Sequence, residues 1–210
     1  MATAGTRPRR AGTDTARRIL ETALELAEER GWANVRLRQV AERLGLDLAD
    51  VLACYRDKDA IANAWFLYGW HAMLTAAPPG FAALPARERI EHVMLAWFDA
   101  LAPHRVVTDQ MLRAKLHPPH PHHWVPMVFD LSRTIHWLRE AALLDAGGRR
   151  GEMEEVGLTW LFLATFAVWA HDDTPGQART RRFLRRCLDR ADRAMTAIWG
   201  PAPPPAEREA

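Results

Sequence analysis

The residues best suited to hold another molecule lie between Arg36 and Lys58. The stretch LGLDLADVLACYRDKDAI, residues 44–61, places a glycine turn before a short helix, which is the spacing of the reading end of a helix-turn-helix. Arg36 and Arg38 lie at the start of the helix before that turn, and Lys58 begins the helix after the short one. Cationic side chains at these places can pair with phosphate oxygens, so the spacing predicts contact with a nucleic-acid backbone.

The short helix itself has an unusual composition for a helix that reads DNA. It carries Asp47, Leu48, Asp50 and Leu52, where lysine, hydroxyl groups and tyrosine are expected. A carboxylate near a phosphate costs binding free energy unless it accepts a hydrogen bond from a base, for example from the N4 amino group of cytosine. Asp47 is a suitable N-cap, whereas the sequence assigns Asp50 no structural role. The pattern therefore predicts the helix-turn-helix fold more directly than it predicts the DNA contact.

The elements that position these residues are helices, because helical periodicity extends through nearly the whole chain and strand patterns are almost absent. We expect an all-α fold of about nine helices. The first helix is predicted from about Asp14 to Arg30 and the second over residues 37–44, ended by Gly31 and Gly45. A long helix follows from about Asp57. The break TAAPPGFAALP, residues 75–85, separates it from the later helices, of which the last three are predicted at about 127–145, 152–171 and 176–199.

Composition limits the classes of function. The net charge is +2, and residues 1–70 hold eleven Arg and Lys against ten Asp and Glu, so affinity for nucleic acid must come from local placement of charge. Cys54 and Cys187 have neither metal nor disulfide spacing, which fits a reducing compartment. The basic N-terminus precedes no apolar signal segment, and the apolar run 156–170 is too short to span a membrane. We expect a cytoplasmic protein without stable membrane insertion.

Residues 19–61 resemble the TetR family of one-component repressors without a gap. They contain an apolar helix, the pair Gly31-Trp32, the Arg, Val-Ala and Gly-Leu pattern of residues 37–46, and the aromatic residue Tyr55 before Lys58. The resemblance implies a three-helix head joined by a long helix to a helical body that binds a ligand and dimerises. The implied organisation is a disordered basic arm at 1–13, a DNA-binding domain at 14–58, a body at 59–199 and a disordered proline-rich tail at 200–210.

The resemblance also implies DNA-contacting positions. The family usually has lysine at position 48, serine or threonine at 50 and tyrosine at 52, and this sequence departs from the family at all three. A reading helix without a lysine makes few favourable contacts with phosphate groups, so flanking cations and the arginine arm must supply the positive charge. The residues predicted to bind operator DNA are Arg17, Arg18, Arg36, Arg38, Asp47, Leu48, Ala49, Asp50, Ala53, Cys54, Tyr55 and Lys58.

For the body, the resemblance implies an effector pocket and a four-helix bundle formed with a second subunit. Aromatic and methionine side chains suit a flat or lipophilic ligand. The predicted ligand-binding residues are Trp97, Met111, Trp124, Phe129, Trp137, Trp160 and Trp169. The predicted dimerisation residues are Leu163, Phe166, Leu184, Leu188 and Met195. The expected function is a homodimeric repressor that a small apolar ligand releases from operator DNA, with no cofactor and no bound metal.

Three alternatives remain open from the sequence. A lipid-binding member of the same fold, similar to accessory proteins of ubiquinone biosynthesis, would keep the architecture and not use the reading helix. The segment HPPHPHH, with His117, His120, His122 and His123, is a possible metal site, but a proline-stiffened surface loop is the simpler explanation, since no Cys or carboxylate motif accompanies the histidines. Cys54 is either a redox switch or a small packed residue. No catalytic motif is present, which predicts that the protein is not an enzyme.

Overall fold

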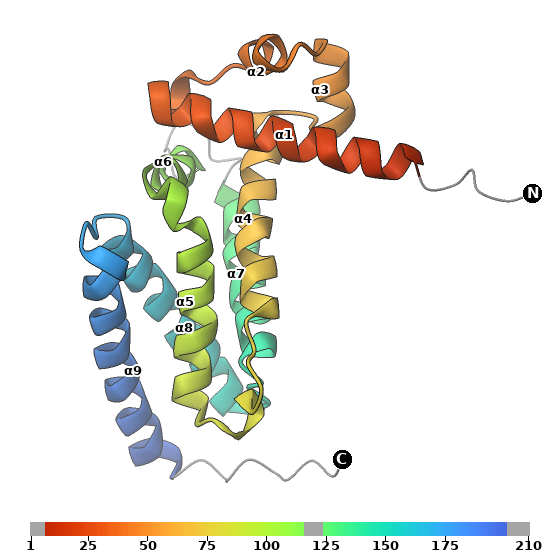
Figure 1. Cartoon of the computed structure of the whole chain (residues 1–210). Helices are drawn as coiled ribbons and strands as arrows, with labels where there is room; N and C mark the ends of the chain where they lie inside the picture. The colour runs from red at the N-terminus through yellow and green to blue at the C-terminus, as the bar shows by residue number, and fades with distance from the viewer. Residues whose placement is uncertain (1–6, 116–123, 201–210) are drawn as a thin grey trace, which may run out of the picture. The chain divides into compact units, whose positions relative to one another are not determined.

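A computed structural model describes the backbone of residues 7–115 and 124–200 and the side chains of residues 12–115 and 131–200. Within these ranges the chain is helical, without a β-strand (Figure 1). The α-helices are α1 (Arg7–Arg30), α2 (Leu37–Leu44), α3 (Leu48–Cys54), α4 (Lys58–Thr75), α5 (Ala86–Leu101), α6 (Arg105–Lys115), α7 (Trp124–Ala141), α8 (Gly148–Trp169) and α9 (Ala178–Trp199). Short 3-10 turns include η1 (Trp32–Asn34) and η2 (Phe81–Ala83). The predicted all-α class is confirmed.

The chain forms two compact units. The head unit comprises residues 1–68 and 103–119, and the body unit comprises residues 69–102 and 120–210. Helix α1 begins at Arg7, so residues 7–13 are helical where the sequence predicted a disordered arm, because Pro8 is tolerated in a first helical turn. The units also differ from the predicted division at residue 58, since α6 packs on α1 and on η1 within the head unit.

The core of the head unit is built from apolar side chains at helical spacing. Ile19 of α1, Val40 of α2, Val51 of α3 and Ile61 of α4 are fully buried or nearly so. Helix α6 closes this unit through polar contacts: Trp65 Nε1 donates a hydrogen bond to Thr108 Oγ1 at 2.8 Å, and the Trp32 N–H donates to Gln110 Oε1 at 2.7 Å. These contacts fix the helix-turn-helix on a rigid support.

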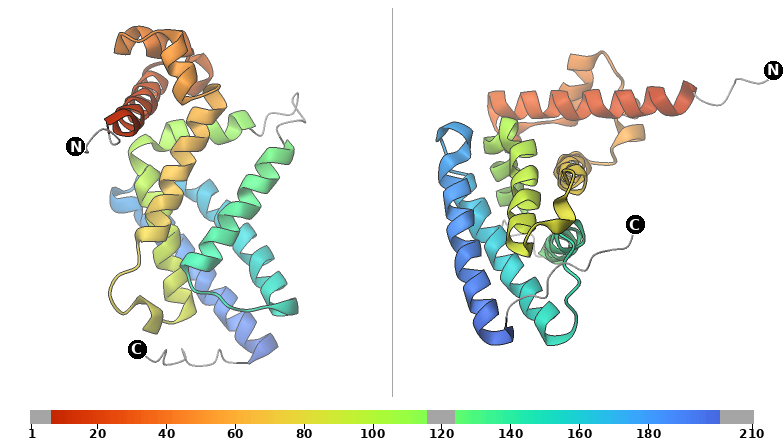
Figure 2. Two further views of the ribbon diagram at one scale, coloured as in Figure 1. Left: turned by 90° about the vertical axis from the view of Figure 1, so that its right-hand side faces the viewer. Right: turned by 60° about the horizontal axis from the view of Figure 1, so that its bottom comes forward.

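In the body unit, α5 and α7 both pack on α8, and α9 packs on α5 and α8 (Figures 1 and 2). The core contains an aromatic cluster of Trp97, Phe98, Phe162, Phe166 and Trp169. Its ring centroids lie 5.1 Å apart for Trp97 and Phe162 and 6.3 Å apart for Trp97 and Trp169, distances at which aromatic pairs attract. None of the helices among the described residues is long and apolar enough to cross a membrane.

Gly69 allows α4 to approach this cluster closely. A Cβ atom at position 69 would lie 2.8 Å from Trp97 Nε1 and 3.2 Å from Leu101 Cδ1. Neither neighbour can move easily, because Trp97 is 3% exposed and Leu101 is fully buried.

We therefore expect Gly69→Ala to destabilise the protein. Alanine gains about 1 kcal/mol of helix propensity over glycine, whereas overpacking a core costs about 1–3 kcal/mol. The net result should be a loss of about 1 kcal/mol in the free energy of unfolding, measured by urea denaturation. Gly157→Ala is the matched control, because a Cβ at Gly157 of α8 meets nothing within 4 Å. Equal or greater stability of Gly69→Ala would contradict the close contact with Trp97.

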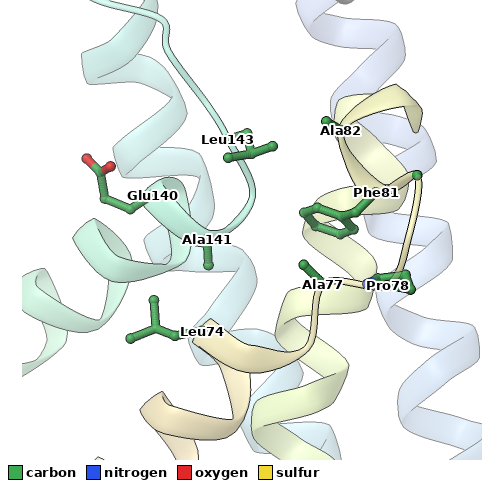
Figure 3. A pocket seen from close by; sticks show the side chains of 9 residues that line it. Leu74, Ala77, Pro78, Phe81, Ala82, Glu140, Ala141 and Leu143 are labelled. Carbon is green, nitrogen blue, oxygen red and sulfur yellow. The ribbon is translucent and has the colours of Figure 1, made fainter. Parts of the chain in front are cut away.

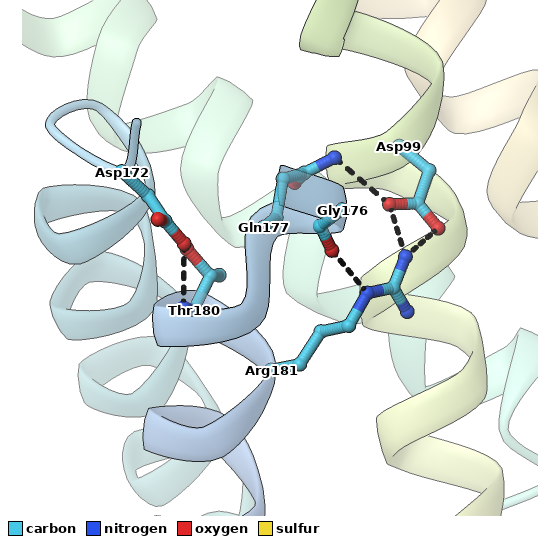
Figure 4. A network of polar contacts seen from close by, with 6 residues as sticks. All are labelled: Asp99, Asp172, Gly176, Gln177, Thr180 and Arg181. Atoms are coloured by element: carbon cyan, nitrogen blue, oxygen red, sulfur yellow. Dashed lines mark hydrogen bonds and ion pairs between the residues drawn. The ribbon is translucent and has the colours of Figure 1, made fainter. Parts of the chain in front are cut away.

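A buried carboxylate connects the end of α8 to the start of α9 (Figure 4). Asp172 is fully buried and accepts hydrogen bonds from the backbone N–H groups of Thr174 at 3.0 Å and Thr180 at 2.7 Å. The hydroxyl groups of both threonines donate to the same carboxylate. Nearby, Arg181 of α9 pairs with Asp99 of α5 at 2.6 Å. The turn is therefore held by polar contacts at its centre and at its edge.

Candidate nucleic-acid interface

The turn between α2 and α3 is built around Gly45. Gly45 adopts the left-handed conformation, with φ 65° and ψ 35°, which glycine takes without steric cost. The N–H of Leu46 donates to the Ala41 carbonyl at 3.0 Å, which closes the end of α2. Val40 and Val51 bury the inner faces of the two helices. The two helices and their turn therefore form a helix-turn-helix whose outer face is α3.

Asp50 has a structural role that the sequence did not reveal. Its carboxylate accepts the backbone N–H of Asp47 at 3.1 Å, which satisfies a donor at the start of α3. The prediction that Asp50 lacks a structural role was therefore wrong. It is the third residue of the helix, where an acidic side chain can reach back to the N-cap. Asp50 remains solvent-exposed, and its negative charge is favourable at the positive end of the helix dipole.

The outer face of α3 is apolar and open to solvent. Leu48 is 55% exposed and Leu52 is 64% exposed, and Ala49 and Ala53 beside them are exposed as well. Val51 is 1% exposed and anchors the opposite face of the helix. Three of the predicted DNA-contacting residues of α3, Leu48, Ala49 and Ala53, thus lie on the surface of the head unit together with Asp50, and Leu52, which was not among the predicted contacts, lies there too.

The next two predicted residues are less exposed. Cys54 is a half-buried free thiol at the end of α3. Tyr55 is half-buried, and its hydroxyl group donates a hydrogen bond to the carbonyl oxygen of Ala16 in α1 at 3.1 Å. Burial raises the pKa of the Tyr55 phenol above its usual value, so it stays protonated and can donate. Tyr55 therefore connects the end of α3 to α1.

Tyr55→Phe should lower the free energy of unfolding by about 1 kcal/mol, because it removes one internal hydrogen bond and leaves the ring in place. Urea denaturation followed by circular dichroism measures this change. Tyr68→Phe is the control, since Tyr68 is 54% exposed on α4. Identical stability of Tyr55→Phe and the unmodified chain would show that the hydroxyl group does not hold α3.

Two of the predicted phosphate-binding cations are engaged within the head unit. Lys58 Nζ donates to the Trp32 carbonyl oxygen at 3.0 Å and lies 5.1 Å from the centre of the Trp32 ring. Burial, and secondly the nearby Arg36 charge, lower the pKa of Lys58. Arg36 Nη1 donates to the carbonyl oxygens of Ala33 at 2.8 Å and Val35 at 3.2 Å. Both side chains therefore stabilise the segment that precedes α2.

Other arginines of the head unit remain accessible. The side chain of Arg38 is 68% exposed and lies 4.0 Å from Glu42. Arg17 is 66% exposed and pairs with Asp14 at 3.0 Å, and Arg18 beside it is exposed. Exposed ion pairs of this kind are worth about 1 kcal/mol or less, so a phosphate can replace the carboxylate. Helices α1 and α2 therefore each contribute exposed basic side chains to the head unit.

Arg56 was missed by the sequence analysis. Its side chain is 82% exposed and lies directly after α3, with its Nε 3.1 Å from an Asp57 carboxylate oxygen. Its position next to the reading helix, between Tyr55 and Asp57, was the available signal. The Asp57 carboxylate, in turn, accepts the N–H of Ala60 at 2.7 Å and begins α4.

The predicted effector-binding residues are divided between the two units. Met111 is buried in the head unit, whereas Trp97 and Trp169 are packed in the aromatic cluster of the body unit. Trp137 is 39% exposed and Trp160 is 70% exposed. The side chains of Trp124 and Phe129 lie outside the described residues.

The body unit instead contains an open cavity of about 550 Å³ at the α4–α5 connection and the end of α7 (Figure 3). Phe81 and Leu143 lie on opposite sides of it, and Glu140 is the single charged residue in its lining. We refer to it as the α4–α5 cavity. It is lined by Leu74, Ala77, Pro78, Gly80, Phe81, Ala82, Glu140, Ala141 and Leu143, none of which was predicted. Several of them belong to the helix-breaking segment 75–85, which appeared in the sequence only as a boundary.

The predicted dimerisation residues divide into two groups. Phe166, Leu184 and Leu188 are at most 6% exposed and form the core of the body unit. Leu163 is 36% exposed and Met195 is half-buried, so these two remain accessible. The apolar surface of α8 is a row at helical spacing, which we call the α8 row and which consists of Met153, Val156, Trp160 and Leu163. Sequence periodicity thus identified mainly residues of α8 and α9 that are buried inside the body unit, and of the α8 row only Leu163 was predicted at the dimer interface.

The described residues contain no group of three His, Cys, Asp or Glu side chains that could hold a metal ion. The candidate metal ligands His117, His120, His122 and His123 lie outside the described residues.

Comparison with known proteins places this architecture among transcriptional regulators. Residues 19–65 match the model of the bacterial regulatory proteins of the tetR family. A TetR transcriptional regulator from Nitrosomonas europaea is 40% identical, with a TM-score of 0.76 over 85% of this chain and 98% of that one. A TetR transcriptional regulator from a Rhodococcus species shares the fold at 17% identity, with a TM-score of 0.62 over 84% of this chain and 95% of that one. No curated protein matches the sequence.

Proposed function

Because the chain belongs to the TetR family of bacterial transcriptional regulators, we propose that it represses transcription as a homodimer bound to operator DNA, until a small apolar ligand releases it. The observation that carries the proposal is the open outer face of α3, presented by a rigid helix-turn-helix with accessible arginines nearby. In such a motif the second helix lies in the major groove while neighbouring cations hold the phosphate backbone.

The proposed phosphate contacts differ from those predicted from the sequence. We assign them to Arg38, Arg56, Arg17 and Arg18, whose side chains are exposed. Half-buried Lys58 and exposed Arg36 are bonded to backbone carbonyl oxygens of the head unit, where they hold η1 and the start of α2 in position. Tyr55 supports α3 from behind. The DNA-reading surface is thus carried by few side chains, mainly those of α3.

The α8 row supports a homodimer. Four large apolar side chains exposed at helical spacing on one helix are costly to leave in water, and a second copy of the same helix can cover them. Trp160, which is 70% exposed, is the largest of them and the natural centre of such a contact. A dimer presents two α3 helices to two half-sites, as the proposed operator recognition requires.

The α4–α5 cavity supports release by a ligand. Its volume of about 550 Å³ lies within the usual range for small-molecule sites, and its lining is apolar apart from Glu140. Leu74, one of the lining residues, belongs to α4, and the first residues of α4 form part of the head unit. A ligand that favours one position of α4 can therefore bias the placement of α3 and shift the population away from the DNA-bound state.

Footprinting tests the proposed function. The purified chain should protect two half-sites whose centres lie one helical turn, about 10 base pairs, or a multiple of it apart in the DNA upstream of its own gene. Apolar compounds that fill the α4–α5 cavity should reduce this protection. A Leu74→Arg variant should bind DNA equally well and lose the response to the compound. A single protected half-site would contradict binding as a dimer. Protection of the DNA that appears only when a compound is present would contradict release by a ligand.

A lipid-binding role is the second candidate, and the exposed leucines of α3 are the observation that favours it. A protein of this fold without DNA affinity would leave α3 free for an apolar partner. Native mass spectrometry of the purified chain discriminates between the two functions. A bound isoprenoid or phospholipid together with no DNA binding at low salt would support the lipid-binding role.

A further inference from the structure

The side chains of α3 can read only part of the chemical pattern in the major groove. Helix α3 has the sequence LADVLAC, which contains no hydroxyl, amide or cationic side chain. Its only side-chain donor is the weak thiol of Cys54, which is half-buried. The acceptors that guanine, adenine and thymine present in the groove, N7, O6 and O4, therefore find no strong donor among these side chains. The thymine C5-methyl group remains, together with the amino groups of cytosine and adenine.

The carboxylate of Asp50 is the one acceptor on this helix that could meet an amino group. It is already the acceptor for the Asp47 N–H at 3.1 Å. Contact with a base would place its charge beside the phosphates, which costs free energy. The side chains of α3 that remain available for the bases are therefore apolar, and they can recognise a base only by apolar contact.

We propose that Leu48 and Leu52 read thymine C5-methyl groups, so that each operator half-site carries thymines where α3 lies in the major groove. This inference rests on the proposed function, and it names the feature of the DNA that the reading helix selects. The two leucines are four residues apart and so share one face of the helix. They are 55% and 64% exposed, while the small side chains of Ala49 and Ala53 beside them allow the helix to approach the base edges closely.

The division of roles in the head unit agrees with this inference. Arg38 and Arg56 contribute affinity through phosphates, which carries no sequence information. The leucines contribute selectivity, because a methyl group in contact with a leucine is removed from water only at a matching base pair. Leucines this exposed are otherwise unfavourable, and a covering partner explains their place on the surface.

Uracil substitution tests this directly. The full chain selects duplexes from a random pool, and each thymine of the recovered half-site is then replaced by uracil, which removes only the methyl group. Each thymine in contact with a leucine should cost about fourfold in affinity, equivalent to about 0.8 kcal/mol for one buried methyl group. Thymines in the flanking DNA should tolerate the replacement.

Variants of α3 identify which leucine is responsible. In Leu48→Ala and Leu52→Ala, the sensitivity to uracil should disappear at the position that the missing side chain contacted, which is the signature of a double-mutant cycle. Leu67→Ala is the control, since Leu67 is 58% exposed on α4, in the same unit. It should keep the full sensitivity.

The outcomes separate the inference from the proposed function. Selective DNA binding with equal affinity for thymine and uracil sites would overturn the methyl readout and leave the repressor proposal intact. Uracil sensitivity that persists in both leucine variants would also overturn it. Failure to recover any duplex, or lipid bound in its place, would overturn the proposed function itself.

Discussion

Replacement of Asp172 by alanine should lower the free energy of unfolding by about 3 kcal/mol, the largest effect on stability that we expect from a single substitution. The variant loses the acceptor for the N–H and hydroxyl groups of Thr174 and Thr180. Thr180 is fully buried, so its two donors cannot find water in exchange, and each orphaned donor costs about 1–3 kcal/mol. Urea denaturation at pH 7 measures the loss. Asp173→Ala, at an exposed neighbouring position, should change the stability by less than about 0.5 kcal/mol.

The same carboxylate predicts a dependence on pH. Burial opposes the ionisation of Asp172, but the four donors from Thr174 and Thr180 outweigh it and hold the pKa well below its usual range. A depressed pKa in the folded state contributes stability above the ordinary aspartate pKa of about 3.9, and this contribution declines as the pH falls below it. Between about pH 5 and pH 2.5 the unmodified chain should therefore lose more stability than Asp172→Asn. Parallel pH profiles would contradict a stabilised carboxylate.

The second large effect concerns assembly. Trp160→Asp should raise the dissociation constant of the proposed dimer at least about a hundredfold, because it places a charge at the centre of the α8 row and removes its largest apolar side chain. Folding should be unaffected, since Trp160 is 70% exposed. Sedimentation equilibrium across a range of concentrations measures the change.

The control for this variant is Val106→Asp, which introduces the same charge at a residue that is 61% exposed on α6 of the head unit. It should leave the dimer intact. If Trp160→Asp dimerises as tightly as the unmodified chain, the α8 row is not the interface. If the unmodified chain is monomeric at tens of micromolar, the homodimer itself is excluded.

Local signals in the sequence were sufficient for the architecture. Gly45 requires a left-handed turn, and the apolar spacing of Val40 and Val51 orients the two helices around it. These features depend on neighbours a few residues away, so a single sequence displays them. The start of α1 was missed because proline and glycine in its first turns resemble a loop while remaining compatible with a helix.

The roles of individual polar groups depend on distant partners. The sequence predicts that Lys58 binds phosphate, whereas in the structure it lies over the Trp32 ring. The sequence predicts that Tyr55 contacts DNA, whereas its hydroxyl group donates a hydrogen bond to the Ala16 carbonyl oxygen. Asp50 is different, because its partner Asp47 is only three residues away and the acidic residue at the third helical position was visible.

The predicted ligand and dimer residues show a further limit of periodicity. Periodicity tells which residues share a helix face but does not tell which face meets another helix. Leu184 and Leu188 were expected at an interface between subunits and instead pack inside the body unit, while Trp160 was expected in a pocket and is exposed. The α4–α5 cavity could not be foreseen, because its walls come from two segments, residues 74–82 and 140–143, that are distant in the sequence.

A fluorescence anisotropy titration at low salt shows whether the open face of α3 recognises operator DNA. The full chain is titrated against a labelled duplex from the region upstream of its own gene and against a scrambled duplex of equal length. We expect saturable binding to the upstream duplex at least about a thousandfold tighter than to the scrambled one, and we expect the affinity to fall steeply as salt is added. Equal affinity for the two duplexes, or no binding where phosphate contacts are strongest, would contradict it.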